Sequence, residues 1–333
     1  MIVQDHPARS KRLCPGDETK GMEETDMKRE AVIIGEGTEY PLNGMLTLPD
    51  DLSVPVPAVV MVHGSGPSNM DEKVRKLTPF KDLADGLAKR GIASIRYDKR
   101  TFAHRFKMMK IRDLTVREET IDDALLALDI LRKDPRIDSG ALFILGHSMG
   151  AMLAPRIDAE GGNVRGLVMM AGTPHRLEDI VIRQIGRAGG DKPVMKWAMG
   201  KMADSYEKKF EGLYGLSDEE AKKKKFSGGM SLWYFKEMGR KTASDYLLEN
   251  DKPVLIMQGG MDVQVEAADD FEEFKEQLAD RKNTEYRLYP YLDHAFVTAL
   301  SDDFTKASRE FALERHIGPE VFDDIADFIK RWA

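Results

Sequence analysis

A serine flanked by two glycines is the first feature of this 333-residue chain that points to chemistry. The motif Gly146-x-Ser148-x-Gly150 lies between an apolar run that predicts a strand and a stretch that predicts a helix. Small flanking residues let the backbone make a sharp strand-to-helix turn that exposes the serine. A serine hydroxyl is a weak nucleophile at neutral pH, so it needs a base and an acid that orients the base.

An aspartate and a histidine that could fill these roles each follow a predicted strand. Asp262 comes just after the predicted strand 254–257, and His294 lies in a short loop after the predicted strand 286–289. Asp293 is a rival acid because it neighbours His294. Adjacent residues on one loop rarely align a ring with a carboxylate, so we predict Asp262 as the acid and His294 as the base.

A glycine-rich segment, VHGSGP at residues 62–67, follows the predicted central strand 58–62. Acyl transfer passes through a tetrahedral oxyanion, and two backbone N–H groups aimed at that oxygen supply much of the catalysis. We predict that one is the amide of Met149, directly after the nucleophile. The other is predicted to be the amide of Ser65, with Gly66 as the next candidate.

Five further histidines have other predicted roles. His63 is expected to shape the oxyanion loop, and His147 lies beside the nucleophile with its side chain directed elsewhere. His104 and His175 fall at or near the expected rim of the site, where they could contact substrate. His316 is expected to be structural. The candidate substrate-binding positions are Gly64, Gly66, His147, His175 and Trp233.

A charged segment follows another predicted strand. We predict that Asp98 forms an ion pair with a basic neighbour on this segment rather than serving the nucleophile. The candidates for that pair are Arg96, Lys99 and Arg100. Basic side chains after the strand could meet a substrate carboxylate or form a solvated loop: Arg100, His104, Arg105 and Lys107.

Short apolar runs alternate with amphipathic stretches along most of the chain. This alternation predicts an α/β fold with a mostly parallel sheet and helices on both faces. The predicted strands are 31–34, 45–48, 58–62, 92–97, 142–145, 164–170, 254–257 and 286–289. The predicted helices include 79–90, 116–132, which has Thr115 as its N-cap, and 319–332.

About 80 residues between two predicted strands exceed what a crossover connection needs. We predict a helical lid at 173–250, inserted into a core made of 27–172 and 251–333. The lid is rich in Met and aromatic residues. These residues suit an apolar acyl or aryl group, and packing of the lid onto the body explains them equally well.

Together the motifs HGSGP (63–67), RYDKR (96–100) and GHSMG (146–150) resemble the α/β-hydrolase superfamily over residues 28–333. The resemblance is closest to bacterial esterases of the dienelactone-hydrolase and acyl-peptidase-like branch. It implies an eight-stranded sheet and hydrolysis of carboxylic esters without a cofactor. It also implies a Ser-Asp-His triad, whose matching residues here are Ser148, Asp262 and His294.

Two other functions stay open at this level. A peptidase or amidase would use the same triad but must protonate a poorer leaving group, and no segment here is long enough for a β-propeller. A non-catalytic binding protein on the same scaffold is disfavoured, because all three candidate groups are present in the expected order.

Composition limits the remaining choices. The formal net charge of −7 argues against a general nucleic-acid binder, and no apolar stretch approaches the length needed to span a bilayer. Residues 1–26 lack the apolar core of a secretory signal and are expected to be a flexible extension. The single cysteine, Cys14, allows no intrachain disulfide, which fits a cytoplasmic protein. No cluster has metal-ligand spacing. The resemblance implies a small-molecule ester substrate, and the oligomeric state stays open.

Overall fold

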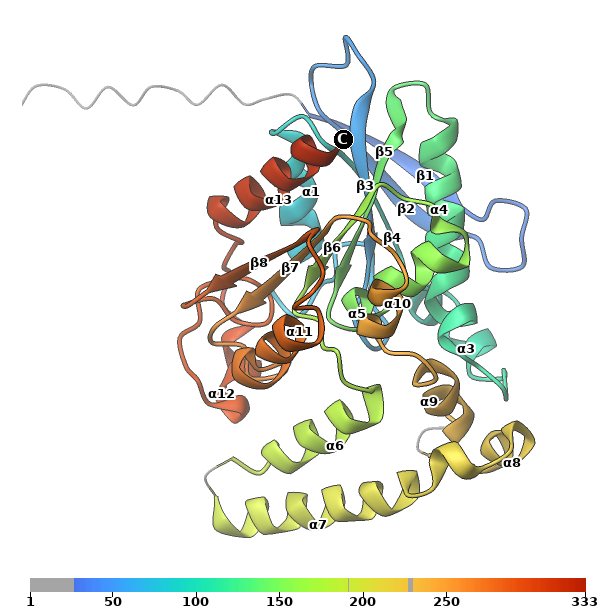
Figure 1. Cartoon of the computed structure of the whole chain (residues 1–333), viewed down its shortest axis with the longest axis vertical. Helices are drawn as coiled ribbons and strands as arrows, with labels where there is room; N and C mark the ends of the chain where they lie inside the picture. Colours follow the sequence, from blue (N-terminus) through green and yellow to red (C-terminus); the bar gives the residue numbers. More distant parts are fainter. Residues whose placement is uncertain (1–26, 191, 227–229) are drawn as a thin grey trace, which may run out of the picture.

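An eight-stranded sheet forms the centre of the protein (Figure 1). The computed structural model describes residues 27–190, 192–226 and 230–333; the predicted extension at 1–26 lies outside them. The strand order is β1-β2-β4-β3-β5-β6-β7-β8. Strand β2 pairs antiparallel with β1 and β4, and all other neighbours are parallel, which confirms the predicted fold class. The strands are β1 (Lys28–Ile34), β2 (Leu42–Leu48), β3 (Val56–Val62), β4 (Ala93–Tyr97), β5 (Ile137–His147), β6 (Gly166–Met170), β7 (Val254–Gly259) and β8 (Thr284–Tyr289).

Helices cover both faces of this sheet and create two separate apolar cores. Helices α1 (Pro79–Ala88) and α13 (Pro319–Trp332) pack together on one face. Helices α4 (Asp122–Lys133), α5 (Met149–Ile157) and α10 (Ala243–Leu248) lie on the other (Figure 1). The central strands are apolar at nearly every position because each of their faces meets a layer of helices.

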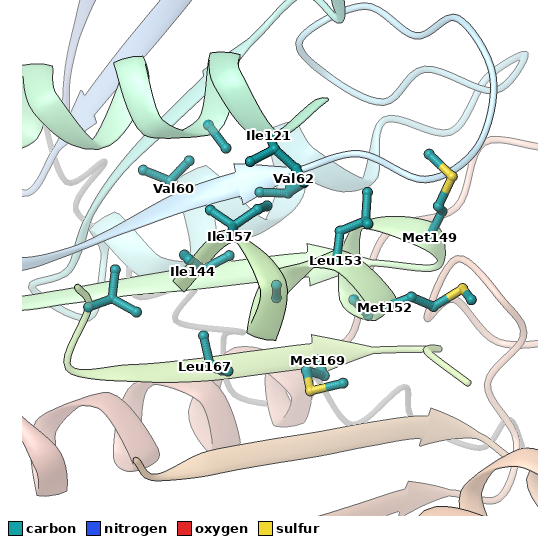
Figure 2. Close-up of a cluster of buried hydrophobic side chains, with 14 of the residues drawn as sticks. Val60, Val62, Ile121, Ile144, Met149, Met152, Leu153, Ile157, Leu167 and Met169 are labelled. Atoms are coloured by element: carbon teal, nitrogen blue, oxygen red, sulfur yellow. The ribbon is translucent and has the colours of Figure 1, made fainter. Parts of the chain in front are cut away.

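One of these cores holds the helix that follows the candidate nucleophile. Figure 2 shows Val60 and Val62 of β3 and Ile144 of β5 in the same cluster as Leu153 and Ile157 of α5. All nine residues of α5 are buried. The first turn of α5 is therefore held against the ends of the central strands.

Segment bounds agree with the sequence predictions where the apolar pattern is strong. Helix α13 has the predicted bounds. Strand β5 is longer than predicted because its first half, from Ile137, contains exposed polar residues that carry no apolar signal. The helix predicted at 116–132 begins with a π-helical turn, η1 (Arg117–Ile121). Thr115 Oγ1 accepts a hydrogen bond from the Arg117 amide at 3.2 Å, as expected of a residue near a helix start.

The segment between β6 and β7 forms the helices of the predicted lid. Helices α6 (Leu177–Arg187) and α7 (Pro193–Phe210) run side by side, away from the sheet (Figure 1). Helix α9 (Leu232–Met238) contacts α6, whereas α10 packs on α5 of the body. No helix within the described ranges, the 18-residue α7 included, is long and apolar enough to cross a membrane. The other elements are α2 (Arg100–Ala103), α3 (Arg105–Met108), η2 (Asp158–Gly162), η3 (Leu213–Gly215), α8 (Asp218–Lys223), η4 (Ala267–Phe271), α11 (Glu272–Gln277) and α12 (Phe304–Glu310).

Candidate active site

Ser148 occupies a strained turn between β5 and α5. Its backbone angles are φ 53° and ψ −121°, a conformation that side-chain-bearing residues rarely adopt. The Ser148 amide donates a hydrogen bond to the carbonyl oxygen of Met170, the last residue of β6, at 2.8 Å. Strain of this kind persists only where the surroundings hold it, and it is typical of functional sites.

Two glycines make this turn possible. A Cβ atom added at Gly146 would lie 2.2 Å from the carbonyl oxygen of Gly150, and one added at Gly150 would lie 2.0 Å from that of Val62. No side chain fits at such distances, so the backbone itself requires glycine on both sides of Ser148. The neighbouring loop also comes close, since a Cβ at Gly64 would be 3.1 Å from the Ser148 Cβ.

The buried Asp262 and the partly exposed His294 form a pair beside this turn. The Asp262 carboxylate lies 2.7 Å from His294 Nδ1. The same carboxylate accepts hydrogen bonds from the amides of Gln264 (2.8 Å) and Val265 (3.0 Å) and from the side chain of Gln258 (3.0 Å). These three donors fix the direction of the carboxylate. His294 thus has one ring nitrogen held by Asp262, and it lines a cavity together with Ser148.

Asp293, the rival acid, faces its own loop. Its carboxylate accepts hydrogen bonds from the amides of Ala295 (2.9 Å) and Val297 (3.3 Å) and lies 3.5 Å from the Arg315 guanidinium. Burial raises the pKa of Asp293 above its ordinary range. The structure therefore pairs the His294 ring with Asp262 and leaves Asp293 to shape the turn.

The loop after β3 brings Ser65 next to Met149. Neither the Ser65 nor the Met149 amide donates a backbone hydrogen bond within the part of the chain that the structure describes. The two residues line the same cavity. By contrast, the Gly64 amide is already bound to Glu72, whose Oε1 accepts its hydrogen bond at 2.8 Å. Among the described residues the Ser65 and Met149 amides thus have no backbone acceptor, and their role at an oxyanion stays a prediction.

His63 anchors the start of this loop, as expected. Its ring contacts the carbonyl oxygen of Asn69 through Nε2 at 3.0 Å and lies against the rings of Phe80 and Tyr97. Burial lowers the pKa of His63 to about 4. The ring is therefore neutral at physiological pH and packs as part of the core.

His147 and Glu72 form a buried ion pair that links two parts of the site. His147 Nδ1 lies 2.9 Å from Glu72, and Nε2 donates to the backbone carbonyl of His294 at 2.8 Å. Burial opposes protonation of His147, but the Glu72 carboxylate outweighs it and raises the pKa of His147 to about 9. Glu72 was missed by the sequence analysis, since nothing but its acidity in the loop after HGSGP marks it.

Some predicted contacts lie elsewhere. Trp233 lies near two cations, with Lys222 Nζ 5.4 Å and the Arg240 guanidinium 5.0 Å from its ring, and it lines neither cavity at the site. The prediction of Trp233 as a substrate contact is therefore wrong. The next residue of α9, Tyr234, instead lines the larger of the two cavities beside Ser65. His175 lies 3.9 Å from Asp270 and lines a separate small pocket.

The predicted ion pair of Asp98 is wrong. Its carboxylate instead accepts a hydrogen bond from the Met70 amide at 2.9 Å. The three basic candidates pair with other acids, because their side chains leave the strand end in different directions. Arg96 pairs with Asp71, Lys99 with Glu119 and Arg100 with Asp123. His316 contacts Asp82 at 3.1 Å, away from the site, and His104 contacts the carbonyl oxygen of Pro41 at 2.8 Å.

Two cavities meet at the Ser65–Pro67 loop. The larger, about 450 Å³, is mostly apolar and is lined in part by residues of the predicted lid. The smaller, about 280 Å³, is more polar and contains Ser148 and His294. Gly66 lines the larger cavity, and Gly64 and His147 line the smaller one. The larger cavity includes Met108, Leu114, Val181, Phe226, Met230, Tyr234 and Phe235.

The described ranges contain no group of three or more His, Cys, Asp or Glu side chains arranged to hold a metal ion. What these ranges bring together is a strained serine, an aspartate-bound histidine and two free amides. This is the set of groups that nucleophilic acyl transfer uses.

Comparisons with known proteins bear on the family and the fold of this chain. The sequence model of the family described as serine aminopeptidase, S33 (Hydrolase_4) matches residues 55–299. Esterase EstD of Thermotoga maritima is 34% identical over 291 residues, which are 87% of this chain and 65% of that protein. The chain thus spans just under two thirds of this relative's length.

Two solved structures share the fold. The esterase Pf2001 of Pyrococcus furiosus has a TM-score of 0.58 at 17% identity, over 98% of this chain and 97% of that one. The acylaminoacyl peptidase of Pyrococcus horikoshii has a TM-score of 0.53 at 13% identity, over 92% of this chain and 42% of that one. At such low identities these matches speak for the fold alone. On its match to the family model, and with the predicted resemblance confirmed, this chain belongs to the Hydrolase_4 (serine aminopeptidase, S33) family of α/β-hydrolases.

Proposed function

We propose that this protein is a serine esterase that cleaves carboxylic esters with an apolar acyl or aryl group. One observation carries the proposal: Asp262 holds the His294 ring at 2.7 Å, and that ring shares a cavity with the strained Ser148. The similarity to Esterase EstD supports the choice of an ester as substrate.

In the proposed reaction, Ser148 Oγ attacks the ester carbonyl carbon while His294 takes the hydroxyl proton. Asp262 fixes the tautomer of His294 and stabilises the imidazolium. The amides of Ser65 and Met149 hold the oxyanion. The intermediate collapses, the C–O bond to the alcohol breaks, and His294 gives its proton to the leaving alkoxide. Water, deprotonated by His294, then attacks the acyl-enzyme and releases the acid and free Ser148.

The two cavities suggest how the ester lies. Met149, a predicted oxyanion donor, lines the larger apolar cavity, and Ser148 lines the smaller polar one. We assign the acyl group to the larger cavity, since its apolar lining gains from burying a chain or ring. The alcohol then leaves through the smaller cavity, past Gln184 and Gln264.

A peptidase or amidase is the second candidate, favoured by the description of the family and by the acylaminoacyl peptidase that shares the fold. An aminopeptidase needs an acid that binds the substrate's terminal amine. In the described lining of the two cavities, the acids are Glu72 and Glu119. Glu72 is already paired with His147 and Glu119 with Lys99, so neither is available to bind an amine.

A substrate panel tests the proposal. It contains p-nitrophenyl esters from acetyl to long acyl, a cinnamate ester and an aminoacyl anilide, with Ser148→Ala as the control. We expect ester turnover that the variant abolishes and no anilide turnover. Anilide turnover would make the protein a peptidase. If no substrate reacts and a fluorophosphonate fails to label Ser148, the protein binds ligands without catalysis.

A further inference from the structure

A buried lysine contacts the loop that carries the predicted oxyanion amide. Lys99 lies two residues after the end of β4, and its side chain is 2% exposed. Its Nζ donates a hydrogen bond to the carbonyl oxygen of Gly64 at 2.9 Å, and its backbone amide donates to the carbonyl oxygen of Ser68 at 2.9 Å. Lys99 therefore binds the loop through its side chain and through its backbone.

The Gly64 carbonyl belongs to the same peptide group as the Ser65 N–H. In a trans peptide the C=O and N–H bonds point in opposite directions, so a donor fixed on the oxygen aims the N–H the opposite way. On the other side of Gly64, Glu72 accepts the Gly64 amide. The Gly64–Ser65 peptide is thus held at its oxygen and the preceding His63–Gly64 peptide at its N–H. The ammonium on the Gly64 oxygen makes the Ser65 N–H a stronger donor.

The lid reaches the same lysine. Lys99 Nζ lies 2.7 Å from Glu119 Oε1, and Glu119 Oε2 accepts a hydrogen bond from the Tyr234 hydroxyl of α9 at 2.6 Å. That hydroxyl also lies 3.6 Å from the sulfur of Met149, the second predicted oxyanion residue. Tyr234, Glu119 and Met149 all line the larger cavity. A chain of contacts therefore runs from the acyl cavity to both oxyanion residues.

We propose that Lys99 is a positioning residue that aims and polarises the Gly64–Ser65 peptide, and that Tyr234 sets Lys99 through Glu119. This inference rests on the proposed function, because it assigns the Ser65 amide to the oxyanion of acyl transfer. A lid side chain thereby helps to determine how well the body stabilises the transition state.

The experiment compares two matched pairs of variants. Because removing one partner leaves the other charge buried and unpaired, the ion pair is neutralised as a whole in Lys99→Met/Glu119→Gln. Its control is Lys236→Met/Asp218→Asn, since Lys236 is also buried and also donates to a carbonyl, that of Leu216, and to an acid, but within the lid. Tyr234→Phe is matched by Tyr214→Phe, which removes a lid hydroxyl bound to Glu178.

The readouts are kcat and KM for the best p-nitrophenyl ester and the affinity of an apolar trifluoromethyl ketone, which forms a tetrahedral adduct with an active serine. We expect Lys99→Met/Glu119→Gln to lower kcat and ketone affinity about 100-fold with KM within about threefold. Tyr234→Phe should lower the same two quantities about fivefold. The control variants should stay within about twofold of wild type, since their sites do not touch the loop.

Unchanged kcat and ketone affinity in a folded Lys99→Met/Glu119→Gln variant, or losses confined to KM, would overturn the role of Lys99. If that variant does not fold, Tyr234→Phe decides: parallel losses in kcat and ketone affinity support the proposal, and their absence overturns it. A wild-type protein that turns over no ester contradicts the proposed function itself and this inference with it. An active wild type with unaffected variants removes only the inference.

Discussion

The nucleophile turn and the lid are held in place by different kinds of contact. At the turn, backbone atoms approach one another so closely that Gly146 and Gly150 have no space for a side chain. In the lid, α7 buries Phe210 alone among its own described residues. The lid meets the body through side chains, such as Arg183 on Asp270 at 2.5 Å and Tyr234 on Glu119 at 2.6 Å.

Because of this difference, we assign the reaction to the nucleophile turn and the selectivity for substrate to the lid. Close backbone contacts hold Ser148 in one conformation, and nucleophilic attack requires such a fixed geometry. Side-chain contacts in the lid can be exchanged at small cost, so the acyl cavity can change without disturbing the turn. Changes in the turn should therefore have large effects on stability and rate, and changes in the lid should mainly alter selectivity.

Two glycine substitutions give the largest contrast. Gly150→Ala should destabilise the protein by more than about 3 kcal/mol and reduce activity at least about 100-fold, because the methyl would meet the Val62 carbonyl. Gly200→Ala in α7, where no atom of the described residues lies within 4 Å of the added Cβ, should stabilise the protein by about 0.5–1 kcal/mol. Urea denaturation and ester turnover measure both. Similar effects at the two positions would contradict the account.

The two candidate acids give the next contrast. Asp262→Asn should lower kcat by about 10³–10⁴, because the amide no longer holds His294 in the required tautomer. Asp293→Asn should change kcat less than about tenfold, since an amide oxygen still accepts from Ala295 and Val297. Steady-state kinetics with one ester compares them. A larger loss for Asp293→Asn would exchange their assignments.

The buried Glu72–His147 pair predicts how stability depends on pH. Folding raises the pKa of His147 from its ordinary value of about 6.5 to about 9. The stabilisation is therefore complete below about pH 6.5 and is lost as pH rises through about 9, a decrease of roughly 3 kcal/mol. Urea denaturation at several pH values should show this decrease in wild type.

Two variants test whether the pH dependence of stability arises in the body or in the lid. Glu72→Gln should flatten the pH dependence, because a buried His147 without its acid no longer gains a proton on folding. Lys201→Ala, which removes an exposed lid contact with Asp204, should leave the dependence unchanged. An unaltered slope in Glu72→Gln would contradict the assignment of the effect to His147.

The lid cavity gives the smallest effect. Val181→Phe fills part of the larger cavity and should shift the preference from long to short acyl chains about tenfold in kcat/KM. Trp233→Ala, which alters a side chain outside the two cavities, should leave the preference within about twofold. A p-nitrophenyl ester series measures both. Equal shifts in the two variants would show that the cavity is not the acyl site.

The sheet and the meeting of Ser148, Asp262 and His294 could be predicted from the sequence for one physical reason. The carboxyl ends of parallel strands lie at the same edge of a sheet. Ser148, Asp262 and His294 follow β5, β7 and β8, so all three lie at that edge. The turn at Ser148 carried a second local signal, since its glycines stand next to it in the chain.

Contacts made by side chains across long separations could not be predicted in this way. Trp233 and Tyr234 are equally aromatic, and only the direction each side chain leaves α9 decides which one enters the cavity. Glu72 meets His147 across 75 positions, with no local pattern to mark the pair. Lys99 lies on a charged segment. Its ion-pair partner could not be predicted, because the partners depend on the directions in which Arg96, Lys99 and Arg100 leave the strand end.

The central claim is that an acyl group passes through Ser148. Wild type would be mixed with p-nitrophenyl acetate, quenched in acid during turnover, digested with trypsin and analysed by mass spectrometry, with Ser148→Ala treated alike. We expect one acetyl group on the peptide of residues 137–156, located on Ser148 by fragmentation and absent from the variant. Turnover with no adduct on Ser148, or with the acetyl group on another side chain in both proteins, would contradict the account.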